Sequence, residues 1–251
     1  MIGLFDSGIG GLTVVRELLG RAPDASFVYL GDTARTPYGN KSSETVVRYA
    51  LEDAAFLMSQ GATSIVIACN SASAVATDAL RREYPNILIF EVIKPAVEAA
   101  CRQGTKRVGV IGTRATIASG SYEKLLRERN VEVIAKACPL FVPLVEEGWL
   151  DEVETKRIAK HYLSSIRQAD VDALILGCTH YPLLTPIIQR FMGKQVRLVD
   201  SGATVVDELL KNIQLEQSAN QRYFLTDLSQ RSEEIAKQWL GRPIRFEKAS
   251  F

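Results

Sequence analysis

The sequence SIVIACNS at residues 64–71 predicts a buried strand that ends in a cysteine and leads into a helix. Its nearly continuous apolar run is typical of a parallel strand whose two faces are both covered. The sequence ALILGCTH at residues 173–180 repeats this pattern, and its Cys178 follows Cys69 by 109 positions. Two strands that end alike in a cysteine indicate an internal duplication.

Outward from these stretches, short β-branched runs alternate with helical patterns along the whole chain. Leu4-Phe5-Asp6 and Ile111-Gly112-Thr113 also correspond, at an offset of 107, although chance alignment of βαβ units is the alternative. Alternation at these lengths predicts parallel sheets. We therefore expect an α/β fold of two similar Rossmann-like parallel-sheet domains, related by a pseudo-twofold axis, with the active site in the cleft between them.

The domain boundaries follow from the length of the repeat. The first domain is expected to comprise residues 1–92 plus about 202–251, because the tail exceeds the repeat, and the second to comprise residues 93–201. Within them we expect a helix capped by Ser42 or Ser43, a single helix over 119–129 and a closing strand near 244–247.

Composition narrows the class of protein. The 251 residues include 30 basic and 29 acidic ones, and this balance argues against nucleic acid as a partner. No apolar run approaches the roughly 20 residues that span a bilayer, and residues 1–5 lack the features of a secretory signal. We expect a cytoplasmic protein that does not bind membranes.

The four cysteines predict free thiols. They are separated by 32, 37 and 40 residues, a spacing that argues against a structural metal site, and a reducing compartment disfavours disulfides. Cys69 and Cys178 each follow a buried strand and precede a helix, the position where ligands bind in open parallel sheets. A helix N-terminus also stabilises a thiolate. Packing is the alternative for these two, and it is the favoured reading for Cys101 and Cys138.

Ionisable residues near the two thiols are further candidates. Asp6 opens the sequence DSGIGG at residues 6–11, which is a poor dinucleotide fingerprint, so its carboxylate suits a bound ammonium group or a neighbouring thiol. A helix cap is the alternative for Asp6, and a structural role is the alternative for His180, which follows Cys178 by two residues. The acidic pair Glu146 and Glu147 is a weaker candidate, because such pairs in loops are usually solvated.

Hydrogen-bond donors gather near the predicted strand ends. Glycine lets a backbone amide approach a ligand closely, and amides at helix starts bind carboxylates. The sequence therefore predicts a site for a small zwitterion or dicarboxylate, with donors from Tyr38-Gly39, Asn70-Ser71 and Thr179-His180.

Four of these motifs, taken in order, resemble the bacterial glutamate racemases of the aspartate/glutamate racemase family. They are FDSGIGGL at 5–12, PYG at 37–39, ACNSA at 68–72 and GCTHYP at 177–182, and PLVEEG at 143–148 extends the likeness. The resemblance covers nearly the whole chain. One departure is Ser71, where the family more often has threonine, so the hydroxyl is kept and a methyl group is lost.

The resemblance implies a racemase that interconverts L- and D-glutamate without a cofactor or metal and supplies D-glutamate for peptidoglycan synthesis. It implies that Cys69 and Cys178 are the two acid/base residues and that Asp6, Glu147 and His180 support them. The implied substrate-binding pairs are Asp6-Ser7, Tyr38-Gly39, Asn70-Ser71 and Thr179-His180. The oligomeric state stays open, with a homodimer as one alternative.

Three other functions remain open at this point. An aspartate racemase would keep the mechanism and differ in pocket length. A non-catalytic binder of amino or organic acids would have no need of opposed thiols and usually carries an export signal. A redox module would form a Cys69–Cys178 disulfide under mild oxidation.

Overall fold

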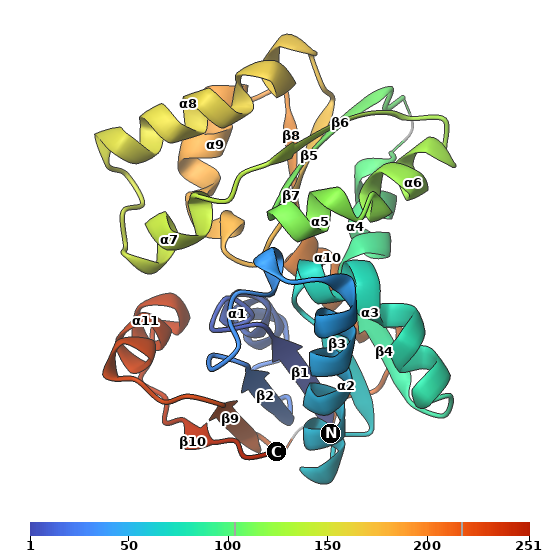
Figure 1. Ribbon diagram of the computed structural model, residues 1–251, viewed down its shortest axis with the longest axis vertical. Coiled ribbons are helices and arrows are strands. Elements are labelled where there is room, and N and C mark those ends of the chain that lie inside the picture. The colour runs from blue at the N-terminus through green and yellow to red at the C-terminus, as the bar shows by residue number, and fades with distance from the viewer. Residues whose placement is uncertain (103, 217) are drawn as a thin grey trace.

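Two parallel β-sheets form the framework of the protein. The computed structural model describes residues 1–102, 104–216 and 218–251. In Figure 1 the first sheet lies below and the second above, with helices against both faces of each. The first sheet has the order β10-β9-β2-β1-β3-β4 and the second has the order β6-β5-β7-β8, every adjacent pair being parallel.

The strands are short and mostly buried, as the apolar runs predict. Those of the first sheet are β1 (Ile2–Asp6), β2 (Phe27–Gly31), β3 (Ser64–Ile67), β4 (Leu88–Glu91), β9 (Gln221–Leu225) and β10 (Glu247–Lys248). Those of the second are β5 (Arg107–Gly112), β6 (Glu132–Ala137), β7 (Ala173–Gly177) and β8 (Arg197–Asp200).

The two sheets share one strand order. The order β2-β1-β3-β4 in the first sheet matches the order β6-β5-β7-β8 in the second. We call each sheet with its helices a unit. In each unit the first strand of the chain is central, the second strand lies on one side of it, and the third and fourth strands lie on the other side. The chain passes from the first sheet to the second after β4, and returns after β8 to add β9 beside β2 and β10 beside β9. The predicted α/β fold with two parallel sheets is confirmed.

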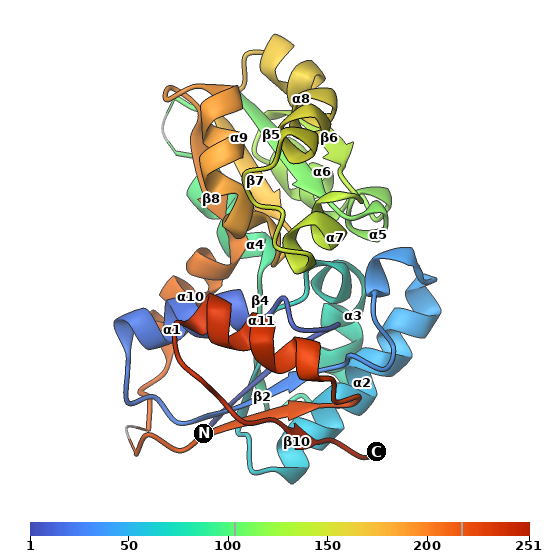
Figure 2. The same ribbon diagram turned by 90° about the vertical axis from the view of Figure 1, so that its left-hand side faces the viewer.

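Helices cover both faces of the first sheet. One face packs against α2 (Ser43–Ser59) and α3 (Asn70–Glu83), which contact each other. The opposite face packs against α1 (Leu12–Arg21), which contacts both α10 (Ser201–Asn212) and α11 (Gln230–Leu240), as Figure 2 shows. The short 3-10 helix η1 (Tyr38–Asn40) precedes α2.

Helices also cover both sides of the second sheet. On one side α8 (Val153–Gln168) packs against α9 (Thr185–Met192), and on the other α4 (Ile93–Ala100) packs against α6 (Ser121–Arg127). The remaining helices are α5 (Arg114–Ala118), α7 (Phe141–Glu146) and the 3-10 helix η2 (Tyr181–Leu184). Because α10 contacts both α1 and α4, it joins the helical layers of the two units.

Local predictions differ in outcome. Ser42 caps α2 as predicted, since its Oγ accepts a hydrogen bond from the Thr45 amide at 3.3 Å. The helix predicted over 119–129 is present but shorter, as α6, because Gly120 adopts a left-handed φ of 67° and separates it from α5. The closing strand is shorter than predicted and begins later, at Glu247.

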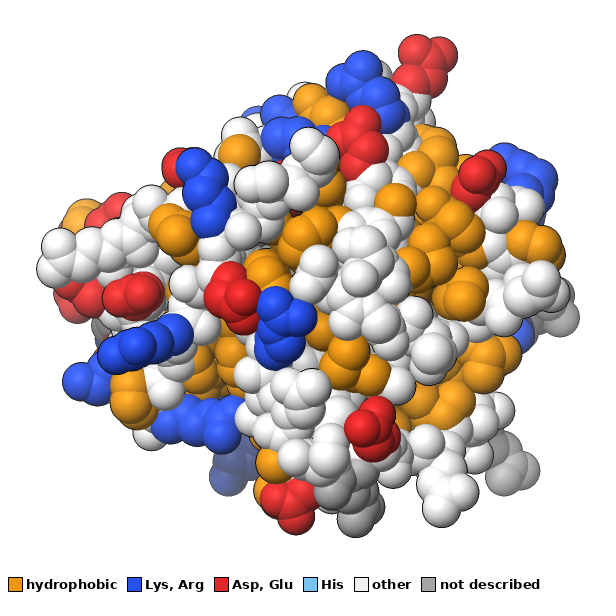
Figure 3. Space-filling model, turned by 90° about the horizontal axis from the view of Figure 1, so that it is seen from below, with side chains coloured by type: hydrophobic (Ala, Val, Ile, Leu, Met, Phe, Trp, Pro, Cys, Tyr) orange, Lys and Arg blue, Asp and Glu red, His pale blue; other side chains and the backbone are white. Residues whose placement is uncertain are grey.

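The surface and helices add two observations. On the face shown in Figure 3, basic and acidic side chains are interspersed with hydrophobic ones. Among the helices that the structure describes, none combines the length and the apolar character that crossing a membrane requires.

A buried chain of hydrogen bonds ties the two units together. Tyr122 of α6 donates its hydroxyl proton to Asn70 Oδ1 at 2.7 Å, and Asn70 Nδ2 donates to Ser201 Oγ at 3.2 Å. Ser201 Oγ in turn donates to the Leu176 carbonyl in β7 at 3.0 Å. The residue after Cys69 is therefore anchored to the strand that leads to Cys178.

Tyr122→Phe should lower the free energy of unfolding by about 1–3 kcal/mol, because it leaves the buried Asn70 oxygen without its donor. Urea unfolding followed by circular dichroism measures the change. Tyr84→Phe is the control, since Tyr84 ends α3 and its hydroxyl forms no hydrogen bond within the described part of the chain; its effect should stay within about 0.5 kcal/mol. Equal effects of the two substitutions would contradict the anchoring role.

Candidate active site

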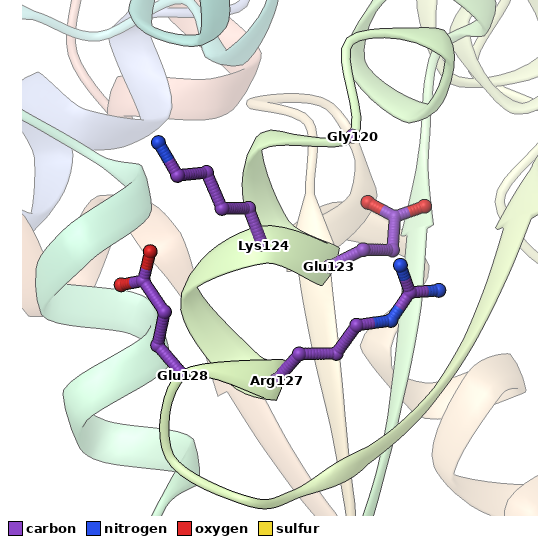
Figure 4. A pocket seen from close by; sticks show the side chains of 5 residues that line it. All are labelled: Gly120, Glu123, Lys124, Arg127 and Glu128. Carbon is purple, nitrogen blue, oxygen red and sulfur yellow. The ribbon is translucent and has the colours of Figure 1, made fainter.

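Both strand-end cysteines line one cavity between the sheets. The first unit contributes Asp6, Ser7, Gly8, Thr36, Pro37, Gly39, Cys69, Asn70 and Ser71, and the second contributes Thr113, Val142, Cys178, Thr179 and His180. The cavity encloses about 40 Å³, which is room for only a few water molecules at roughly 10–15 Å³ each. A larger hollow of about 570 Å³ beside α6 is lined by Glu123, Lys124, Arg127, Glu128 and Gly120 and holds no thiol or imidazole (Figure 4).

Cys69 sits at the start of α3 in the protonated form. Its side chain caps the helix, with Sγ 3.5 Å from the Ala72 amide, and the thiol donates to Ser7 Oγ at 3.5 Å. Burial, aided by the nearby charge of Asp6, raises the pKa of Cys69 to about 12. The free protein therefore holds this residue as a thiol at neutral pH.

Asp6 ends β1 and is almost fully buried, with 1% of its surface exposed. Its Oδ2 accepts a hydrogen bond from the Gly8 amide at 3.2 Å, whereas its Oδ1 has no partner within the described part of the chain. Burial raises the pKa of Asp6, while the charge of His180 and the backbone amides around it act in the opposite direction. A buried acceptor at the cavity is suited to a cationic group of a ligand.

Cys178 contacts His180 across a short turn after β7. The Cys178 Sγ lies 3.8 Å from Nδ1 of His180, and Nε2 of the same ring lies 2.9 Å from Glu146 Oε1. Burial acts to lower the pKa of His180, but its contacts with Cys178 and Glu146 outweigh burial and raise it to about 10. The ring of Trp239 from α11 packs nearly perpendicular to the imidazole ring, with the two ring centroids 5.6 Å apart. His180 is thus an imidazolium at neutral pH.

The structure does not bring Glu147 to the thiols. Its side chain is 71% exposed and its Oε2 lies 3.9 Å from Nη2 of Arg231, while the preceding residue, Glu146, reaches His180. Successive residues at a helix end point about 100° apart, so only one of the acidic pair faces inward. Arg231 also donates to the Glu146 carbonyl at 2.8 Å, which ties α11 to the end of α7.

The predicted substrate-binding pairs divide between the cavity wall and its support. The phenol of Tyr38 points away from the cavity toward Asp53, whereas Gly39 lines the cavity. A Cβ atom on Gly39 would lie 2.8 Å from Cβ of Thr113, so only glycine fits between the two units there. The Asn70 side chain is engaged in the chain of hydrogen bonds to Ser201, which leaves its backbone for a ligand.

Hydroxyl groups from both units meet at one wall of the cavity. Ser71 Oγ lies 2.9 Å from Thr113 Oγ1 and 3.2 Å from Thr116 Oγ1. Sequence reasoning did not select Thr113 as a site residue, although the 107-residue offset places it opposite Asp6. Trp239 was also missed, and no motif marks it.

The two thiols have unequal helical surroundings. Cys69 directly precedes the first turn of α3, whereas Cys178 is followed by the 3-10 helix η2 before α9 begins. The expectation of a helix start after each cysteine is thus met in full only at Cys69.

No group of three or more His, Cys, Asp or Glu side chains within the ranges 1–102, 104–216 and 218–251 is arranged to hold a metal ion.

The glycine turn of the first unit packs directly on the second. A Cβ atom on Gly10 would lie 2.3 Å from Oγ1 of Thr179 and 2.6 Å from Cε1 of His180. Thr13 donates to the Thr179 carbonyl at 2.8 Å from the same turn. The absence of a side chain at residue 10 therefore allows the two halves of the site to close on each other.

Residues 13–209 match the family model of Asp/Glu/hydantoin racemases. The chain belongs to this racemase family. It is 48% identical over 244 residues to the glutamate racemase of Aquifex aeolicus, covering 97% of this chain and 95% of that one. The resemblance inferred from the motifs is confirmed.

Solved structures of racemases in this family have the same fold. A Francisella tularensis glutamate racemase in complex with D-glutamate superposes with a TM-score of 0.91 at 35% identity, covering 99% of this chain and 97% of that chain. The Aquifex pyrophilus glutamate racemase gives 0.86 at 45% identity, with 99% and 98% covered. A Picrophilus torridus aspartate racemase, at 20% identity and a TM-score of 0.62, shares the fold.

The environment of His180 in this racemase predicts a distinctive titration. NMR of ¹⁵N-labelled imidazoles should show His180 protonated through pH 8, with His161 as the only other histidine signal. Because the pKa exceeds the ordinary 6.5, protonation of His180 should stabilise the fold fully below about pH 6.5 and lose this effect as pH rises through about 10.

Substitution of the acidic pair distinguishes its two members. Glu146→Gln should lower the pKa of His180 because it removes a charged acceptor, and Glu147→Gln is the matched control that should leave it unchanged. A larger shift with Glu147→Gln would show that the outward residue, rather than Glu146, controls the imidazole.

Proposed function

We propose that the protein interconverts L- and D-glutamate by a two-thiol acid/base mechanism that needs no cofactor. The observation that carries the proposal is that Cys69 and Cys178 reach one cavity from different sheets. Inversion at Cα requires loss of a proton from one face and gain of another on the opposite face. Two opposed groups accomplish this without movement of either around the substrate.

Relatives support glutamate as the substrate. Many similar proteins along nearly the full length of the chain are named glutamate racemase. One structural relative contains D-glutamate, and the Escherichia coli glutamate racemase, at 27% identity, contains L-glutamate together with an activator. The small polar cavity, with a carboxylate and several hydroxyl groups, agrees with an amino acid ligand.

The two thiols begin the reaction in different protonation states. Cys178 lies beside the His180 imidazolium and starts as the thiolate that removes the Cα proton, while the Cys69 thiol delivers its proton to the opposite face. For the other enantiomer the roles are exchanged. Asp6, with its unpartnered oxygen, is placed to accept a hydrogen bond from the substrate ammonium group.

The carbanion formed at Cα needs electrostatic stabilisation. The first-turn amides of α3 have no partners within the helix and suit the α-carboxylate, as do the hydroxyls of Ser71 and Thr113. In a dry site each well-aimed donor contributes about 3 kcal/mol. The γ-carboxylate of the substrate would bind to the remaining hydrogen-bond donors of the cavity wall.

Binding requires the cavity to open. Since the closed space holds only a few water molecules, glutamate enters when residues 93–201 move away from residues 1–92 and about 202–251, which we propose as the two domains. Reclosure would exclude water and align the thiols. Free thiols suit a reducing cytoplasm, where the D-glutamate formed would feed peptidoglycan synthesis.

Solvent exchange tests the mechanism. In D₂O the wild-type protein should exchange the Cα hydrogen of both enantiomers, measured by ¹H NMR. Cys69→Ala and Cys178→Ala should each reduce racemisation by about 10²–10⁴-fold and retain exchange with one enantiomer only, because one acid/base group remains. Cys101→Ala, which changes a half-buried thiol outside the cavity, is the control and should be unaffected. Normal racemisation by either active-site variant would exclude the two-thiol mechanism.

Substrate comparison separates the racemase alternatives. We expect kcat/KM for glutamate to exceed that for aspartate by about 10–200-fold, the range that one methylene group provides. A higher kcat/KM for aspartate would identify the protein as an aspartate racemase. Binding of glutamate with no exchange of its Cα hydrogen would instead indicate a non-catalytic binder.

A further inference from the structure

A buried polar cluster lies behind the wall of the cavity that η1 forms. Asp32 and Asp53 are fully buried, and Asp32 follows β2 while Asp53 lies on α2. Arg35 donates through Nε to Asp32 Oδ2 at 2.5 Å, through Nη2 to Asp53 Oδ1 at 2.9 Å and through Nη1 to Oε2 of the partly exposed Glu52. The hydroxyl of Tyr38 lies between the same two carboxyl groups, in hydrogen-bond contact with Oδ2 of each.

The hydrogen bonds of this cluster require one proton more than a neutral Tyr38 and two ionised aspartates contain. The Tyr38 oxygen contacts two carboxyl oxygens, but a phenol has only one proton to donate. One of the two carboxyl groups must therefore be an acid that donates to the Tyr38 oxygen. With two ionised carboxylates, the one phenol proton would serve one of these oxygens and leave the other buried acceptor without a donor.

The donors around each carboxyl group identify which one holds the proton. Asp32 accepts from Arg35 and Tyr38 on Oδ2 and from Thr226 on Oδ1 at 2.8 Å, so donors occupy both of its oxygens. Asp53 receives only the Arg35 donor on Oδ1, which leaves Oδ2 to donate. Burial, reinforced by the charge of Asp32, raises the pKa of Asp53 well above its usual range.

The cluster is connected to the cavity through η1. Tyr38 is followed directly by Gly39, whose backbone lines the cavity and packs against Thr113 of the second unit. The tilted ring of Tyr49 packs on Tyr38 at 5.5 Å, and the Arg35 guanidinium stacks on Tyr49 at 4.2 Å. The phenol and guanidinium thus hold η1 from the side opposite the ligand space.

We propose that Asp53 is a positioning residue that carries a proton in the working protein and, through Tyr38, holds Gly39 against the catalytic cavity. This inference rests on the proposed glutamate racemase function of that cavity. The carboxylates of Asp32 and of the partly exposed Glu52 face Arg35, and the neutral Asp53 acid completes the hydrogen bonds of Tyr38. Substrate binding then depends on an acid that never touches the substrate.

Isosteric variants test the assignment because asparagine imitates a protonated aspartic acid. Asp53→Asn can accept from Arg35 through Oδ1 and donate to Tyr38 through Nδ2, so KM for glutamate and kcat should stay within about twofold of wild type. Asp53→Ala removes the acceptor of Arg35 Nη2 and the donor to the Tyr38 oxygen, and it should raise KM about tenfold, with a smaller change in kcat. Asp32→Asn removes the buried carboxylate of the cluster, leaves Arg35 only the partly exposed Glu52 as a charged partner, and should resemble Asp53→Ala. The exposed Asp78→Asn on α3 is the control.

The outcomes separate this inference from the proposed function. An Asp53→Asn variant as impaired as Asp53→Ala, or an Asp32→Asn variant as active as wild type, would overturn the assignment. ¹³C NMR of the aspartate carboxyl carbons at pH 7 gives a readout that does not depend on activity: Asp53 should have the shift of a protonated acid, and a carboxylate shift would overturn the inference. Failure of the wild-type protein to racemise glutamate would contradict the proposed function. The NMR measurement would still show whether Asp53 is protonated.

Discussion

The parallel pairing of a central strand with the strand that leads to a cysteine, made once in each sheet, determines where the two thiols lie. In the first sheet Phe5 pairs with Ile67, so the chain emerges from the sheet at Asp6 and Cys69 together. In the second sheet Gly112 pairs with Gly177, which is one residue before Cys178, so Thr113 and Cys178 also leave the sheet beside each other. Because both edges face one cavity, two parallel pairings of similar register bring both thiols to it.

The duplication also explains why the two thiols differ. Asp6 corresponds to Thr113, and Ser71 corresponds to His180. The ionisable residue near the thiol is therefore Asp6 in the first unit and His180 in the second, at different positions of the repeat. Cys69 receives a carboxylate from the neighbouring strand, which disfavours its thiolate. Cys178 receives an imidazolium from its own turn. The same backbone thus supports one thiol beside a carboxylate and one thiol beside an imidazolium.

Sequence patterns predicted the parts of this arrangement that depend on backbone periodicity. Apolar runs identified the strands, and the 109-residue offset identified the cysteines that face each other. The choice between Glu146 and Glu147 could not be predicted, because it depends on the direction of a side chain at the last turn of a short helix. The same holds for the Tyr38 phenol, which turns away from the cavity toward carboxyl groups contributed by β2 and α2. Packing between distant segments decides these directions, as it does for Trp239.

The unequal thiols have a kinetic consequence in the proposed mechanism. After one turnover the protons are exchanged, so Cys69 is a thiolate and Cys178 a thiol. With a pKa of about 12, Cys69 regains a proton readily, and the free protein relaxes to its starting form. Since the enantiomers have equal free energy, kcat/KM must be equal in the two directions, but kcat and KM need not be individually equal. The substrate whose Cα proton faces Cys178 therefore binds the predominant form, in which Cys69 is a thiol, while its mirror image must bind the minor form with a Cys69 thiolate.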